Sequence, residues 1–213
     1  MKFDPHIKYR GAFYKEFTQE QIKNETMFFN CDLEYAWQHG GEITRAFILN
    51  LPVDWRMCNP VLDSRVHMLM KDWYPCIPGW HHDDVPRSTE SGQPNYINPE
   101  YHSEHLIGLV NAEICPTKFL TQPVELSEPD VTKTIYETWH KEIDNTYPRS
   151  TMDVQSGYYL EFDCNTFHTG TQAVGNGWRW FCRLSRNTDR QKTITNEIRR
   201  QVQVYLENPI MGW

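Results

Sequence analysis

Proline and glycine interrupt this chain so often after residue 75 that it is divided into short apolar segments. Segments of this kind, bounded by turn residues, are typical of the strands of a sandwich or barrel. We expect strands at residues 64–72, 105–115, 118–126 (interrupted by Pro123), 157–162, 178–186 and 201–206. The run Gly175-Asn176-Gly177 is a hairpin signal in front of residues 178–186. The sequence therefore predicts a mainly β protein with flanking helices.

Helical signals gather near the N-terminus. Residues 18–29 start with Thr18, a favourable N-cap, and Gln21 follows three positions later, which predicts a capping box. Residues 131–141 fit either a helix or a strand. A chain of 213 residues without internal repeats is long enough for one domain with its own core. We expect a support region at 1–63, a catalytic core at 64–187 and a C-terminal extension at 188–213.

Charge and hydropathy argue against several classes of protein. A net charge of −7 disfavours binding to nucleic acid, which needs a basic surface. The longest apolar stretch, residues 46–53, contains Asn50 and Pro52 and is far shorter than the roughly 20 residues of a membrane span. The N-terminus has no apolar signal-peptide core, so we expect a cytoplasmic protein. The six cysteines form no CxxC pair and are expected to be reduced, buried thiols.

Residues 81–84, His-His-Asp-Asp, are a candidate for metal binding. In a strand, residues i and i+2 point to the same face, so His81 and Asp83 would present an imidazole beside a carboxylate. His82 and Asp84 form the alternative frame on the other face. His168, after a strand-like segment, is the best third ligand. Two histidines and a carboxylate leave positions open on a metal and suit non-haem Fe(II). Taken alone, His-His-Asp-Asp fits a solvated polar turn equally well.

The expected strand at residues 178–186 has two different faces. One face carries Trp178, Trp180, Cys182 and Leu184, and the other carries Arg179, Phe181, Arg183 and Ser185. If both faces are covered, the two guanidinium groups need anionic partners. They fit either a pocket for a dicarboxylate beside the metal or ordinary ion pairs to Asp or Glu on an exposed face.

Together these motifs resemble the Fe(II)/2-oxoglutarate-dependent oxygenase superfamily, whose pattern is H-x-D, a distal His and an Arg on the following strand. Residues 157–162, His168 and the run Gly177-Trp178-Arg179 resemble the phytanoyl-CoA hydroxylase-like branch. The run at residues 80–84 resembles the W-H-x-D-D of alkylated-base demethylases, which favours the frame of His81 and Asp83. The resemblance covers about residues 65–187. It implies a double-stranded β-helix, a jelly-roll, cupin-like barrel of about eight strands.

The resemblance also implies the site and its reaction. His81, Asp83 and His168 would be the catalytic metal ligands for Fe(II), with 2-oxoglutarate as co-substrate. Arg179 would bind the far carboxylate of 2-oxoglutarate, Arg183 and Ser185 would complete that site, and the two arginines could exchange roles. Oxidative decarboxylation of 2-oxoglutarate by O2 would be coupled to hydroxylation of an unidentified small molecule or side chain. The alternatives are oxidation or demethylation of a nucleobase, and a non-catalytic metal-binding barrel that acts as a binding module.

The segment after the first ligands is a candidate lid. Residues 85–103 form a long stretch rich in Pro, Ser, Gly and Asn, and they include Arg87, Tyr96, Tyr101 and His102. Loops of this length are uncommon unless they are functional or disordered, although an ordinary surface loop is the simpler interpretation. His67 and His105 are expected to be structural, because a lone strand histidine is more often a satisfied core or surface residue than a ligand.

Overall fold

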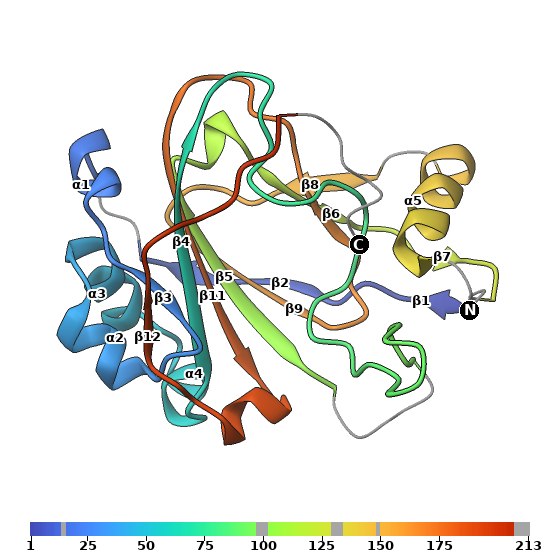
Figure 1. Cartoon of the computed structure of the whole chain (residues 1–213), viewed down its shortest axis with the longest axis horizontal. Helices are drawn as coiled ribbons and strands as arrows, with labels where there is room; N and C mark the ends of the chain where they lie inside the picture. Colours follow the sequence, from blue (N-terminus) through green and yellow to red (C-terminus); the bar gives the residue numbers. More distant parts are fainter. Residues whose placement is uncertain (14–15, 97–101, 129–133, 148–149, 207–213) are drawn as a thin grey trace.

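The computed structural model describes residues 1–13, 16–96, 102–128, 134–147 and 150–206, and within them antiparallel strands dominate (Figure 1). The largest sheet has the order β2-β9-β5-β11-β4, formed by Ile7–Ala12, Tyr158–Asp163, Glu104–Val110, Gly177–Arg186 and Val61–Leu69. A second sheet has the order β10-β6-β8, formed by His168–Gly170, Thr117–Leu120 and Thr151–Asp153. Two short pairs join β1 (Lys2–Phe3) to β7 (Val124–Glu125) and β12 (Glu197–Arg199) to β3 (Met27–Phe29).

Four short helices cover one face of the five-stranded sheet, on the left in Figure 1. They are α1 (Gln19–Lys23), α2 (Leu33–His39), α3 (Glu42–Leu49) and α4 (Val53–Met57). Their apolar side chains, such as Phe47 and Trp55, share one buried cluster with Trp180, Cys182 and Leu184 of β11. The period-two alternation predicted for residues 178–186 is therefore confirmed, with its apolar face against the helices. No helix within the described ranges is both long and apolar enough to cross a membrane.

The other face of the large sheet is turned toward the three-stranded sheet. Phe162 of β9 and Phe119 of β6 meet edge to face, with ring centroids 4.8 Å apart, in a cluster that includes Ile107 and Leu160. The helix α5 (Ile135–Thr146) packs beside this layer through Trp139. The mainly β architecture with flanking helices is confirmed. The strand pairings of the described residues close no barrel, so the jelly-roll barrel stays a prediction.

The N-terminal helix is shorter than predicted. Thr18 and Gln21 form the expected capping box, but the helix ends at Lys23, and residues 27–29 form β3. Tertiary packing overrides helix propensity here, because Phe28 is fully buried and β3 pairs with β12. The strand expected at residues 64–72 also has different bounds: β4 runs from Val61 to Leu69, and it is buried on both faces.

Three other expectations are wrong. The run 175–177 does not form a hairpin, because β10 and β11 belong to different sheets. Residues 201–206 contain one isolated bridge, from Tyr205 to Tyr74, and the last strand within the described residues is β12 instead. Residues 81–84 form no regular strand, since the pairing there is a single bridge between His81 and His168.

Two sequence predictions are confirmed in part. The segment 131–141 contributes to α5, which starts at Ile135, while residues 131–133 lie outside the described residues. All six cysteines are free thiols, and Cys31, Cys115, Cys164 and Cys182 are buried, whereas Cys58 and Cys76 are partly exposed.

Candidate metal centre

Three side chains from two distant segments converge between the sheets. His81 and His168, which starts β10, bond to each other antiparallel through their backbones, with both N–H···O distances 3.1 Å. This pairing brings Asp83 beside His168, whose Nε2 lies 3.2 Å from Asp83 Oδ2. One ligand atom from each of the three residues lies within 4.8 Å of the others. The donor set, two imidazoles and one carboxylate, is the facial set that suits a divalent iron ion.

The backbone orients both imidazole rings. His81 Nδ1 lies 2.8 Å from the Gly79 carbonyl oxygen, and His168 Nδ1 lies 3.2 Å from the Thr166 carbonyl oxygen. A carbonyl oxygen only accepts hydrogen bonds, so each Nδ1 carries a proton, and Nε2 is the ring nitrogen that each histidine could offer to a metal. Metal-bound histidines usually have such a partner for the second ring nitrogen. The surroundings of both rings therefore fit metal coordination through Nε2.

The protonation states also fit metal binding. Burial, and then the neighbouring His168, lower the pKa of His81 to about 3, so its imidazole is neutral near pH 7. Burial alone would raise the pKa of Asp83, but the charge of Arg183, with a contribution from His168, holds that pKa well below its usual value. A metal needs neutral imidazole and ionised carboxylate, and His81 and Asp83 are already in these states.

The alternative frame points elsewhere. The His82 ring packs on Phe167 with ring centroids 3.8 Å apart, and its Nδ1 lies 2.8 Å from the Tyr96 hydroxyl. Asp84 has a positive φ of 49° and forms ion pairs with Arg190 and Arg183 at 3.4 and 3.8 Å. The backbone turn at Asp84 thus separates His82 and Asp84, which do not form a joint ligand pair.

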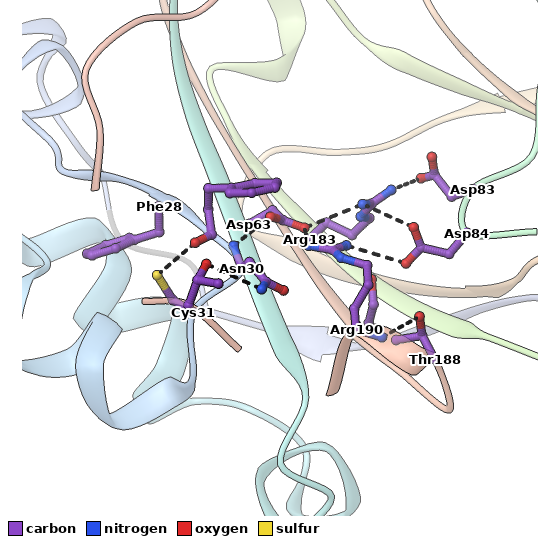
Figure 2. A network of polar contacts seen from close by, with 12 residues as sticks. Phe28, Asn30, Cys31, Asp63, Asp83, Asp84, Arg183, Thr188 and Arg190 are labelled. Atoms are coloured by element: carbon purple, nitrogen blue, oxygen red, sulfur yellow. Dashed lines mark hydrogen bonds and ion pairs between the residues drawn. The ribbon is translucent and has the colours of Figure 1, made fainter. Parts of the chain in front are cut away.

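Arg183 connects Asp83, a candidate metal ligand, to a network of aspartates (Figure 2). Its Nη1 lies 2.5 Å from Asp83 Oδ2, and its Nη2 lies 3.4 Å from Asp63 Oδ2. Arg190 extends the network, with Nη2 2.7 Å from Asp63. Burial would lower the pKa of Arg183, but Asp83, Asp84 and Asp63 together raise it, so the guanidinium stays charged. Arg183 therefore holds the Asp83 carboxylate in place.

Arg179 has a different environment on the same strand. It is 2% exposed, its Nη2 donates to the Thr117 hydroxyl at 2.8 Å, and its Nε has no hydrogen-bond partner. Among the described residues no carboxylate forms an ion pair with it. Arg179 and the three candidate ligands line one cavity of about 350 Å³ between the sheets. A buried cation without a counter-ion is costly, which marks this end of the cavity as a place for an anion.

Ser185 and His105 lie away from this cavity. Ser185 is fully buried and its hydroxyl lies 2.9 Å from His105 Nδ1, while His105 Nε2 lies 3.2 Å from the Ser103 hydroxyl. Neither residue is among the described residues that line the cavity. Both ring nitrogens of His105 have hydrogen-bond partners, which agrees with its predicted structural role. The role of Ser185 in co-substrate binding stays a prediction without a contact to the cavity.

The lining contains a residue that the sequence interpretation did not assign to the site. His67 of β4 pairs in register with Arg179, lines the cavity, and forms no hydrogen bond of normal geometry through either ring nitrogen. Burial and the charge of Arg179 lower its pKa well below the usual value, so the ring is neutral. The signal was present in the sequence, since Asp63, Arg65 and His67 alternate along one face of β4.

The predicted lid is described in part. The Tyr96 hydroxyl donates to the Tyr136 hydroxyl at 3.0 Å, so this part of the segment 85–103 is tied to α5. Arg87 donates to the Gly92 carbonyl at 2.8 Å, and the His102 carbonyl accepts from Asn187 at 2.8 Å. Tyr101 lies outside the described residues. A lid function stays a prediction.

Comparison with known proteins gives little guidance. No protein-family profile matches the chain, and no curated protein matches it. Among solved structures, the crystal structure of EvdMO1 is similar with 12% sequence identity and a TM-score of 0.47. The alignment covers 87% of this chain and 48% of that one, so this chain spans about half the length of that protein. A similarity this low supports no argument about function, which must come from the site itself.

Proposed function

We propose that the protein is an Fe(II)- and 2-oxoglutarate-dependent oxygenase. The observation that carries this proposal is the shared cavity, in which a buried arginine that no described carboxylate pairs with accompanies a candidate His-Asp-His ligand set. A metal-binding module alone would need the ligands but not Arg179. The double-stranded β-helix suggested by the sequence belongs to the same proposal, and the two facing antiparallel sheets support it.

His81, Asp83 and His168 would hold the iron. Three protein ligands on one side leave the remaining positions open for small molecules. When bound, Fe(II) together with 2-oxoglutarate supplies the activation of O2 that oxidises a second molecule, with release of CO2 and succinate. The backbone carbonyls at Gly79 and Thr166 keep Nε2 of both rings directed at the ion.

The two arginines of β11 would have separate roles. Arg183 forms ion pairs with Asp83, Asp63 and Asp84, so it positions the ligand carboxylate. These three carboxylates already balance its positive charge, so it is a poor site for another anion. Arg179 has no carboxylate partner within the described residues and would form a bidentate pair with the far carboxylate of 2-oxoglutarate. The Thr117 hydroxyl fixes the orientation of its guanidinium. The burial of Arg179 excludes water from this pair, which strengthens it.

A succinate-release assay tests the proposal. With Fe(II), 2-oxoglutarate and O2, we expect a panel of candidate substrates to contain compounds that raise succinate release, and we expect a chelator or removal of O2 to stop it. Duplex and single-stranded oligonucleotides with alkylated bases belong in the panel, because they test the nucleobase alternative. Succinate release that continues unchanged after chelation and removal of O2 would contradict the proposal, as would 2-oxoglutarate that stays intact with every compound.

A further inference from the structure

The cavity beside the candidate ligands contains more positive charge than the proposed reaction uses. The arginines that line it are Arg65, Arg179, Arg183, Arg190 and Arg199. The aspartates that line it are Asp63, Asp83 and Asp84. This local excess of cations contrasts with the net charge of −7 of the whole chain. It therefore calls for a specific explanation.

Two of the five arginines have ion-pair partners in the structure, and a third has a proposed partner. Arg183 and Arg190 form ion pairs with the three aspartates, and Arg179 is assigned to 2-oxoglutarate. Arg65 and Arg199 remain, and neither forms an ion pair within the described part of the chain. Arg199 donates through Nε to the Phe28 carbonyl at 3.3 Å, and its guanidinium lies over the Phe29 ring, 4.4 Å from the centroid.

Arg65 lines each of the three cavities that reach the candidate metal ligands. It lies on the inward face of β4, opposite Phe181 of β11 in the strand register. It lines three neighbouring cavities of about 350, 660 and 540 Å³, and each of them also reaches His81 and Asp83. Arg179, in contrast, lines the first of these cavities and not the other two. Arg65 thus faces the space from which a second molecule would approach the metal.

Arg199 lies near Arg65, although the two residues are far apart in the sequence. It belongs to β12, which pairs with β3, and it lines two of the three cavities together with Arg65. Burial, and then the charge of Arg65, lower the pKa of Arg199 against a smaller opposing effect of Asp63, so the two guanidinium groups lie close enough to repel each other. Two half-buried guanidinium groups that form no ion pair with any described residue make a site that an anion would stabilise.

We infer that the primary substrate carries an anionic group, a carboxylate or a phosphate, that Arg65 and Arg199 bind beside the metal. That the bound anion belongs to a substrate rests on the proposed function. Binding of the anion itself needs no iron. Guanidinium groups bind both anions through paired N–H donors, so the shared chemistry is an oxyanion with at least two acceptor oxygens. The rings of Phe29 and Phe181 also line this cavity and offer apolar surface to the rest of the molecule.

Calorimetric titration of the full chain with inorganic phosphate and with acetate tests the anion site. Both are added to metal-free protein, with and without saturating 2-oxoglutarate. We expect at least one of the two anions to bind wild type, without competition from 2-oxoglutarate, and about 10-fold more weakly to Arg65→Gln and to Arg199→Gln. Arg45→Gln is the matched control, because it removes one positive charge from α3, away from these cavities, and should leave the affinity unchanged.

Several results would overturn the inference. They are no binding of either anion to wild type, complete displacement of the anion by 2-oxoglutarate, and equal affinities in Arg65→Gln and Arg45→Gln. Arg65→Lys keeps the charge and should bind the anion more tightly than Arg65→Gln, and thermal unfolding shows that each variant is folded.

If Arg65→Gln loses the anion but 2-oxoglutarate is never consumed, the proposed function fails and the anion site stands. If neutral compounds are the substrates and Arg65→Gln oxidises them at the wild-type rate, the inference fails and the proposed function stands.

Discussion

His168→Ala is expected to weaken Fe(II) binding by at least about 100-fold, because it removes one of three donors from the ligand set. The two remaining donors, His81 and Asp83, cannot enclose one side of the ion. The His168 ring also stacks on Phe119, with centroids 5.3 Å apart, so the variant should unfold at a lower temperature than wild type. Anaerobic calorimetric titration with Fe(II), at a temperature at which circular dichroism shows the variant folded, measures the affinity.

The matched control for this prediction is His82→Phe. His82 belongs to the alternative frame, and its ring lies among aromatic side chains that include Phe3 and Phe167. Phenylalanine preserves that packing and removes both ring nitrogens, so Fe(II) affinity should stay within a few-fold of wild type. Loss of Fe(II) binding in His82→Phe would favour the other frame, and full Fe(II) affinity in His168→Ala would contradict the assignment of the third ligand.

Arg179→Gln is expected to weaken 2-oxoglutarate binding by about 10- to 100-fold while Fe(II) affinity stays unchanged. The reason is that Arg179 would be the sole cation for the far carboxylate in a buried position, where glutamine offers hydrogen bonds but no charge. Because Arg179 forms no ion pair with the ligands, its removal should not disturb the iron. Anaerobic titration of the Fe(II)-loaded protein with 2-oxoglutarate measures the change.

Arg183→Gln provides the comparison for Arg179→Gln. Arg183 contacts Asp83 at 2.5 Å, so its loss should affect mainly the iron and the orientation of Asp83. We therefore expect Arg179→Gln to lower mainly the affinity for 2-oxoglutarate and Arg183→Gln to lower mainly the affinity for Fe(II). A larger loss of 2-oxoglutarate affinity in Arg183→Gln than in Arg179→Gln would show that the two roles are exchanged and would contradict the assignment.

The parts of this site that depend on local patterns could be predicted from the sequence. The spacing within residues 81–84 left two ligand frames open, and the W-H-x-D-D resemblance favoured His81 and Asp83, which the structure brings together with His168. The alternation along residues 178–186 put Arg179 and Arg183 on one face, opposite the tryptophans, and the structure shows that this face lines the cavity. Residues 81–84 nevertheless do not form a strand. The backbone bridge between His81 and His168 brings the three donors together instead.

The features that depend on tertiary pairing could not be predicted. Arg183 differs from Arg179 because Asp63 lies opposite it on β4, and nothing in the sequence shows that β4 and β11 are neighbours. Arg199 enters the site through the pairing of β12 with β3, a partnership between the two ends of the chain. The same pairing ends the helix predicted for residues 18–29 at Lys23. Local propensity does not contain such long-range contacts.

The most direct test of the central claim is the visible absorption of the wild-type protein with Fe(II) and 2-oxoglutarate under anaerobic conditions. If iron at His81, Asp83 and His168 is chelated by 2-oxoglutarate, a weak charge-transfer band should appear when both are present. It should be absent with either one alone and in His168→Ala. Tight Fe(II) binding without such a band at any 2-oxoglutarate concentration would contradict the account and leave a metal site that does not use this co-substrate.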